Sequence, residues 1–181
     1  MGTRRTGNVA QITIAAIAVL LQACSIASAQ DVTEPALKAA FILNFARFTE
    51  WPANVVPPTE PLAICVLGDP AVRDELERLA KGRAIAGHRV AVSLVTSAGP
   101  KGVCHVLYVS GVTASQASQL VIGLRDLAVL TISDIDGFVP AGGIAQFFFE
   151  HGMLRFSVDA LAAKRAQLQI SSRLLALARN K

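Results

Sequence analysis

Cysteine and histidine side chains are the first candidates for chemistry in this chain, because together they could bind a metal ion. His105 directly follows Cys104, and Cys65 lies in an earlier apolar run. These three side chains are one fewer than the four ligands of a structural zinc site, and no C-x-x-C or H-x-x-H spacing accompanies them. We therefore predict no metal site.

Other patterns that often carry catalysis are incomplete in this sequence. Asp134 and Asp136 resemble the start of a calcium loop, but the later ligands and the closing glutamate are missing, so a turn explains them better. Gly68 is a single glycine followed by Asp69, whose carboxylate would repel a phosphate. Ser110 lies in no G-x-S-x-G elbow. We predict no catalytic residues and no cofactor, and an unrecognised enzyme is the weakest hypothesis.

The elements that would position any site begin only after an export signal. Arg4 and Arg5 supply a positive region, residues 12–23 form a short uncharged run, and residues 27–29 (Ala-Ser-Ala) form a cleavage site. The run is shorter than the roughly 20 apolar residues that span a bilayer. We predict cleavage after Ala29, a periplasmic location and no transmembrane segment in the mature chain. The alternative is a lipoprotein modified at Cys24.

The remaining residues, 30–181, have the size of one domain, which buries about two-thirds of its unfolded surface. Cleavage reduces the Lys and Arg residues from 17 to 15, against 13 Asp and Glu, and no basic run remains. We therefore predict no nucleic-acid partner. Cys65 and Cys104 are the two cysteines left, and an oxidising compartment favours one disulfide, which would contribute about 4 kcal/mol. Two free buried thiols are the alternative.

Apolar runs and turn residues predict an α/β domain with a largely parallel central sheet flanked by helices. The predicted strands are 62–67, 89–95, 103–109, 127–132, 144–150 and 153–158. One helix begins at Pro70 and stops at Gly82, and another spans 113–124. The last two strands flank the His151-Gly152 turn, so we expect an antiparallel hairpin at one side of the sheet.

Two further helical segments are strongly apolar. The stretch from Ala36 to Trp51-Pro52 places aromatic residues on one stripe, and its opposite side is nearly as apolar. Such a helix lies in a core, which is our first interpretation, or between a core and a partner. Residues 159–179 would carry leucines on opposite sides of a single helix. We therefore predict a break near 169–171, with Ser171 or Ser172 capping a second short helix.

Three blocks of the sequence resemble the YfiR family of exported bacterial proteins. They are residues 38–52 (KAAFILNFARFTEWP), the segments GGIAQF and LRFSV within 142–158, and residues 168–178 (LQISSRLLALA). The family's cysteine pair maps onto Cys65 and Cys104. A second pair, known in the family near the position of Gly142, has no counterpart here, which puts in doubt any redox-sensing role that depends on it.

The resemblance implies a periplasmic regulator that forms homodimers and represses an inner-membrane diguanylate cyclase. It would bind the periplasmic sensor region of the cyclase and so lower cyclic di-GMP. We expect apolar residues of the first and terminal helices to contact the partner or the second subunit: Phe41, Phe45, Phe48, Trp51, Leu174, Leu175 and Leu177. The alternative function is a periplasmic small-molecule receptor that uses the crevice at the carboxyl ends of the strands.

Overall fold

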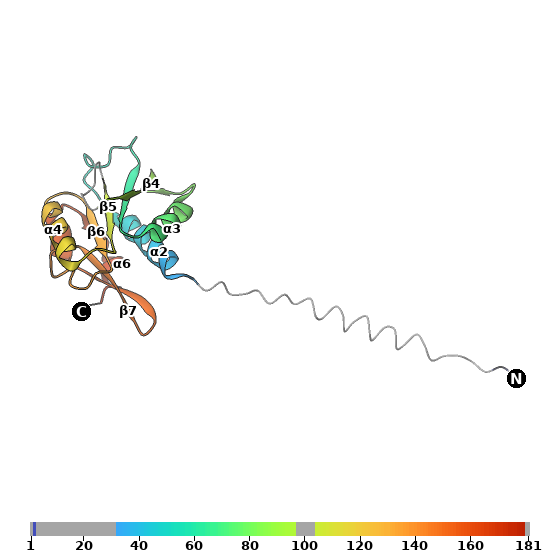
Figure 1. The fold of residues 1–181 in the computed structure, drawn as a ribbon. Helices are drawn as coiled ribbons and strands as arrows, with labels where there is room; N and C mark the ends of the chain where they lie inside the picture. The colour runs from blue at the N-terminus through green and yellow to red at the C-terminus, as the bar shows by residue number, and fades with distance from the viewer. Residues whose placement is uncertain (1, 3–31, 97–103, 180–181) are drawn as a thin grey trace. The chain divides into compact units, whose positions relative to one another are not determined.

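The computed structural model describes residues 32–96 and 104–179, together with residue 2. The rest of the predicted export signal therefore lies outside the described residues. A seven-stranded sheet in the order β3-β4-β2-β5-β6-β7-β8 forms the centre of the fold (Figure 1). Its strands are β2 (Leu62–Leu67), β3 (Ala84–Ile85), β4 (His88–Val95), β5 (Val106–Val109), β6 (Leu130–Ser133), β7 (Ala145–Glu150) and β8 (Met153–Val158).

The predicted fold class is confirmed. The four central pairs, β4–β2, β2–β5, β5–β6 and β6–β7, are parallel, and only the two outermost pairs are antiparallel. The helices are α2 (Glu34–Arg47), α3 (Pro70–Ala80), α4 (Ala114–Leu124), α5 (Ala160–Arg165) and α6 (Ser172–Leu175). A separate two-stranded antiparallel sheet joins β1 (Thr49–Glu50) to β9 (Gln169–Ile170).

Helices cover both faces of the sheet at β2, and this strand is apolar throughout. Along β2, Ile64 and Val66 belong to one core cluster, which includes residues of α2 and α3. Cys65 and Leu67 point to the other face, where α4 contributes Ala117 and Val121. Because successive side chains of a strand alternate between faces, a strand covered on both sides reads as a continuous apolar run.

The first helix is shorter than its sequence predicts. Thr33 caps α2, Pro35 lies in its first turn, and the helix ends at Arg47 rather than at Trp51-Pro52. The reason is tertiary: Thr49 and Glu50 leave the helix to pair with Ile170 and Gln169 of β9. The helix is nevertheless a core helix, as our first interpretation had it, since three turns of it are buried against the sheet.

The later strands and the C-terminal segment largely follow their predictions. The hairpin of β7 and β8 is present, with both residues of its turn, His151 and Gly152, at positive φ. The predicted break in the C-terminal segment is also present, because α5 ends before β9 and Ser171 caps α6. Two strands begin later than expected, β5 at Val106 and β6 at Leu130. The predicted start of the former, Val103, lies outside the described residues.

A disulfide joins Cys65 in β2 to Cys104 just before β5, with their Cα atoms 5.8 Å apart. The bridge therefore links two neighbouring parallel strands across 39 residues of sequence.

Candidate functional site

Four side chains from three parts of the chain meet beyond the carboxyl ends of β5 and β6. The Oδ2 atom of Asp134, just after β6, accepts hydrogen bonds from Lys38 Nζ of α2 (2.6 Å), Tyr108 Oη of β5 (2.9 Å) and Ser110 Oγ (3.1 Å). Lys38 also forms an ion pair with Glu34, one turn earlier in α2. We call Lys38, Tyr108, Ser110 and Asp134 the carboxyl-end cluster.

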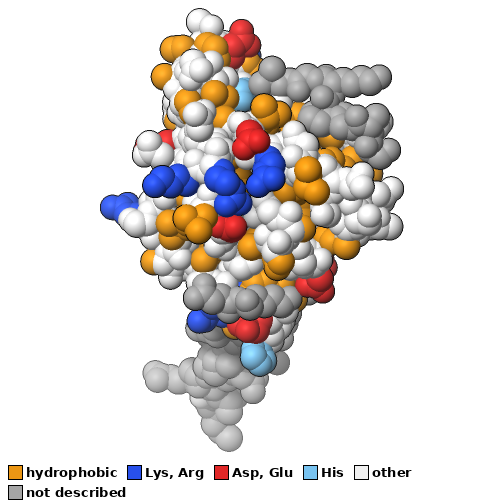
Figure 2. Space-filling view, turned by 90° about the vertical axis from the view of Figure 1, so that its left-hand side faces the viewer, with side chains coloured by type: hydrophobic (Ala, Val, Ile, Leu, Met, Phe, Trp, Pro, Cys, Tyr) orange, Lys and Arg blue, Asp and Glu red, His pale blue; other side chains and the backbone are white. Residues whose placement is uncertain are grey.

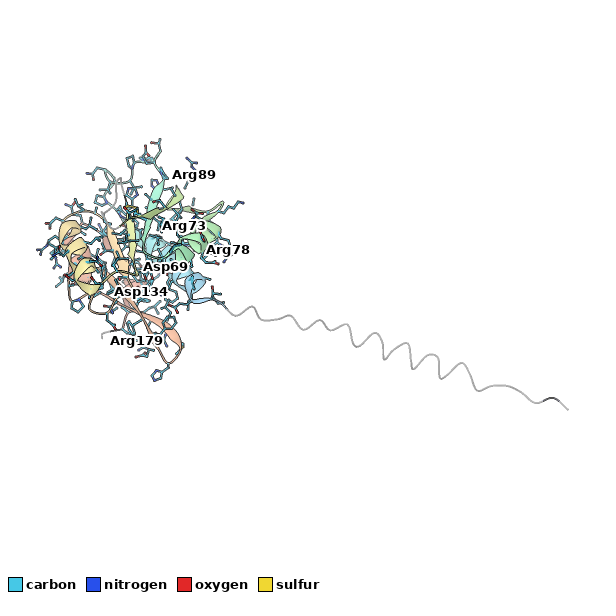
Figure 3. All side chains as sticks on the ribbon, viewed as in Figure 1. Asp69, Arg73, Arg78, Arg89, Asp134 and Arg179 are labelled. Atoms are coloured by element: carbon cyan, nitrogen blue, oxygen red, sulfur yellow. A yellow bond between two sulfur atoms is a disulfide. The ribbon has the colours of Figure 1, made fainter. Side chains whose placement is uncertain are left out.

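Two pKa shifts fix the charge state of this cluster. Burial alone would lower the pKa of Lys38, but the hydrogen bonds and charges of Asp134 and Glu34 outweigh it, and the pKa lies above its ordinary value. Burial, followed by the nearby charge of Asp134, strongly raises the pKa of the Tyr108 phenol. Asp69, which caps α3 and lies in the same region (Figure 3), adds to that rise. The cluster therefore holds a charged lysine and a neutral tyrosine at neutral pH.

This geometry suits a structural clamp better than a reactive site. Lys38 is only 7% exposed, and a single oxygen of Asp134 accepts all three hydrogen bonds. Such charge-assisted bonds are strong, and they fasten α2 to the ends of two central strands. From the sequence we expected Asp134 only in a turn, and its role as the shared acceptor was missed. The one available signal was a lysine set within an apolar helix, which needs a buried partner.

At the point where the strand order reverses, between β2 and β5, the two loops that follow these strands lie against each other. Gly68 and Gly111, both at positive φ, bring the loops after these strands into backbone contact. A Cβ atom on Gly68 would lie 1.9 Å from the Ser110 carbonyl oxygen. A hollow of about 290 Å³ lies beside the carboxyl-end cluster, lined by Lys38 and Asp134 together with Glu34, Asp136 and residues of the β7–β8 hairpin.

A second polar group ties loops together near the amino ends of the strands. His105 Nδ1 accepts from the Ala63 N–H (2.9 Å), so its proton is on Nε2 and is donated to the Val55 carbonyl (3.1 Å). Trp51 Nε1 donates to the His105 carbonyl oxygen (3.2 Å). Burial lowers the pKa of His105, which keeps the ring neutral. Trp51 and His88 also line an apolar pocket of about 380 Å³ beside this group.

Metal binding at His105 finds no support in this geometry. Both ring nitrogens of His105 are engaged by backbone groups, and the Cys65 and Cys104 thiols are consumed by the disulfide. Within residues 32–96 and 104–179, no group of three or more His, Cys, Asp and Glu side chains could hold a metal ion.

Two of the predicted contact residues are not on the surface. Phe45 is fully buried, with its ring centroid 4.9 Å from Phe156 and 5.7 Å from Phe147 in edge-on contacts, and Leu174 is 5% exposed within the same core. Both side chains belong to the larger hydrophobic core cluster. Phe41 is half-buried and also packs edge-on against the rings of Phe147 and Phe156.

The structure brings the end of α2 and the start of α6 together. Ser171 N–H donates to the Phe48 carbonyl (2.8 Å), and Thr49 pairs with Ile170. The β1–β9 sheet therefore places the end of α2 beside α6, although about 120 residues separate them in the chain. Phe48, Trp51 and Leu175 are half-buried there, and Leu177 is 68% exposed. We call Phe48, Leu175 and Leu177 the β1–β9 surface.

Other exposed apolar side chains were not anticipated from the sequence. They are Val32 before α2, Leu94 on β4, Ile122 on α4, Leu127 just after α4, Phe149 and Met153 on the hairpin, and Leu161 on α5. On the face that Figure 2 shows, Lys and Arg side chains gather near the middle, and the hydrophobic side chains that are described lie scattered among polar ones. That face therefore presents single apolar residues rather than one continuous patch.

A family model described as YfiR/HmsC-like matches residues 35–179, from the first turn of α2 to the last described residue. Comparison with curated proteins gives no match. None of the helices within the described residues is long and apolar enough to cross a membrane.

Proposed function

Because the chain belongs to the YfiR/HmsC-like family, we propose that it is a periplasmic regulator that represses an inner-membrane diguanylate cyclase. It binds the periplasmic sensor region of the cyclase and lowers cyclic di-GMP. Cleavage of the export signal after Ala29 and a homodimeric state belong to the same proposal. The observation that carries it is the family match over almost the whole described domain.

The geometry of the polar groups supports a role in binding rather than catalysis. The carboxyl-end cluster and the His105 group are both built from side chains that hold structural elements together. A protein of this kind acts on a partner by binding one of its conformational states more tightly than another. The partner's inactive state would then be the one that this chain stabilises.

The β1–β9 surface is our proposed contact with the cyclase. It combines the first and last family-like segments, and Leu177 offers an apolar side chain that is 68% exposed. Exposed apolar anchors of this kind contribute most where they enter a partner's pocket. Burial of one leucine side chain contributes about 1.5–3 kcal/mol, enough to weaken binding by tenfold or more when it is removed.

The experiment compares intracellular cyclic di-GMP in strains with and without the cognate cyclase. Deletion of the gene should raise cyclic di-GMP only where the cyclase is present, and Leu177→Glu should reproduce the deletion while the protein remains folded and exported. Leu127→Glu is the matched control, since Leu127 is 53% exposed on another part of the molecule. Equal cyclic di-GMP in the deletion and parent strains would overturn the proposal.

A further inference from the structure

Helices α4 and α5 lie beside each other and present cations to solvent. Arg125, at the end of α4, and Arg165 of α5 line the same small hollow, together with Val121 and Ala162. Both arginines are exposed, as is Lys164 beside them. Figure 2 views the side on which Figure 1 places α4, and Lys and Arg side chains gather near the middle of that view. We call Arg125, Lys164 and Arg165 the basic patch.

Carboxylates of the described chain do not neutralise the basic patch. None of its three side chains forms an ion pair with another described residue, whereas the arginines of α3 pair with carboxylates of their own helix. Neither α4 nor α5 contains an Asp or a Glu. Two carboxylates flank the helices. Asp126 follows α4, and Asp159 caps α5 by accepting hydrogen bonds from backbone N–H groups of its first turn (2.8 and 2.9 Å). Three cations against these two carboxylates leave the face positive.

Exposed aliphatic side chains stand beside these cations on both helices. Leu161 is 69% exposed and lies one turn before Arg165 on α5. Ile122 is 59% exposed and lies three residues before Arg125 on α4. Residues three or four apart share one face of a helix. Cations next to exposed leucine or isoleucine are typical of helices that lie on a membrane interface.

We propose that this face of α4 and α5 binds the anionic phospholipid surface of the inner membrane. The basic patch contacts the headgroup phosphates, and Leu161 and Ile122 enter the headgroup region. The inference rests on the periplasmic location included in the proposed function, and it does not depend on the cyclase. Each Lys or Arg close to an anionic lipid surface strengthens binding about fivefold. Binding of this kind is reversible, and it concentrates the protein beside a membrane-embedded partner.

The shape of the face favours lipid over a small ligand or a folded partner. The hollow between α4 and α5 is about 10 Å³, which leaves room for at most one water molecule, so it does not hold a small anion such as phosphate. A specific protein interface has a fully buried apolar core. Here single aliphatic side chains alternate with charged ones, and the described hydrophobic side chains are scattered over the view in Figure 2. Fluid headgroups can contact such a surface without a matching shape.

The test is cosedimentation with phospholipid vesicles of protein purified from cells that express the full chain. The protein should bind vesicles of phosphatidylglycerol and phosphatidylethanolamine, less strongly as the salt concentration rises, and should not bind phosphatidylcholine vesicles. Arg125→Glu/Arg165→Glu should lower the partition coefficient about 30-fold or more. Arg83→Glu/Arg89→Glu is the matched control, since it changes the net charge equally at exposed positions of the β3–β4 edge. It should lower the partition coefficient about threefold at most, because salt screens distant charges.

A second measurement does not depend on the folding of any variant. Anionic vesicles should slow amide hydrogen exchange in α4 and α5 of the unaltered protein, and leave exchange in β3 and β4 unchanged. Absence of binding to anionic vesicles, protection confined to other elements, or equal losses for the two arginine pairs would overturn the inference.

The same variants separate a lipid contact from a contact with the partner protein. Loss of cyclase repression in Arg125→Glu/Arg165→Glu, with vesicle binding unchanged, would assign this face to the partner protein and so overturn the membrane contact. Vesicle binding needs no cyclase, so its failure leaves repression standing. The cyclic di-GMP comparison tests repression separately.

Discussion

Removal of the Lys38 ammonium is the perturbation that most directly probes what holds α2 on the sheet. Lys38→Met keeps the apolar stem of a side chain that is only 8% exposed, but it leaves Asp134 with two neutral donors, Tyr108 and Ser110. Breaking a buried pair by removing one partner costs about 3–5 kcal/mol. The Asp134 side chain is 22% exposed and keeps two hydrogen bonds, so we expect the lower end, about 3 kcal/mol.

The interaction energy between Lys38 and Asp134 can be measured with a double-mutant cycle. It compares urea unfolding of Lys38→Met, Asp134→Asn and the double variant with that of the wild type. We expect about 2 kcal/mol for Asp134→Asn, because Lys38 keeps Glu34 as a partner. The double variant buries no unpaired charge, so it should lose about 3 kcal/mol, roughly 2 kcal/mol less than the sum of the singles. Arg78→Met, in the exposed pair with Glu75, should cost less than about 1 kcal/mol. An additive cycle, or equal losses for Lys38→Met and Arg78→Met, would refute the clamp.

Two further predictions concern backbone contact and pH. Gly68→Ala combines a positive φ with a Cβ atom 1.9 Å from the Ser110 carbonyl oxygen, so we expect a loss of about 3 kcal/mol or more in urea unfolding. Gly82→Ala, at a similar φ but with nothing within 4 Å, should cost only about 1 kcal/mol, and equal losses would contradict the close contact. The pKa of His105 is lowered by burial in the folded state, so the unfolded chain binds more protons as the pH falls. The free energy of unfolding should therefore fall as the pH drops below 6.5. Urea titrations at pH 7 and pH 5 should show a larger fall in the wild type and in His151→Gln than in His105→Gln. An equal fall in all three proteins would refute this.

The central sheet could be predicted from sequence because its signals are local. A run such as Leu62–Leu67, or the turn at His151-Gly152, carries its own periodicity and turn chemistry. The break before Ser171 was likewise visible, since one helix could not bury leucines on opposite sides. These features depend on neighbours in the chain rather than on distant partners.

Contacts between residues far apart in the chain could not be predicted from the sequence. The predicted end of α2 was wrong because Thr49 and Glu50 pair with β9, which lies about 120 residues later in the chain. The Lys38–Asp134 pair spans 96 residues, and no local pattern connects its members. Phe45 and Leu174 looked like surface contacts because an apolar helix does not reveal which of its sides the sheet will cover.

The β1–β9 pairing links the folding of an early segment to the synthesis of a late one. The small sheet includes residues 169–170. Thr49 and Glu50, which follow α2, therefore cannot form their strand pairing until residues 169–170 have been synthesised. Contacts of such long sequence separation form slowly, because the intervening loop must be ordered first. A chain shortened by a dozen residues lacks Ile170, so Thr49 has no strand partner and the junction between α2 and the C-terminal segment cannot form.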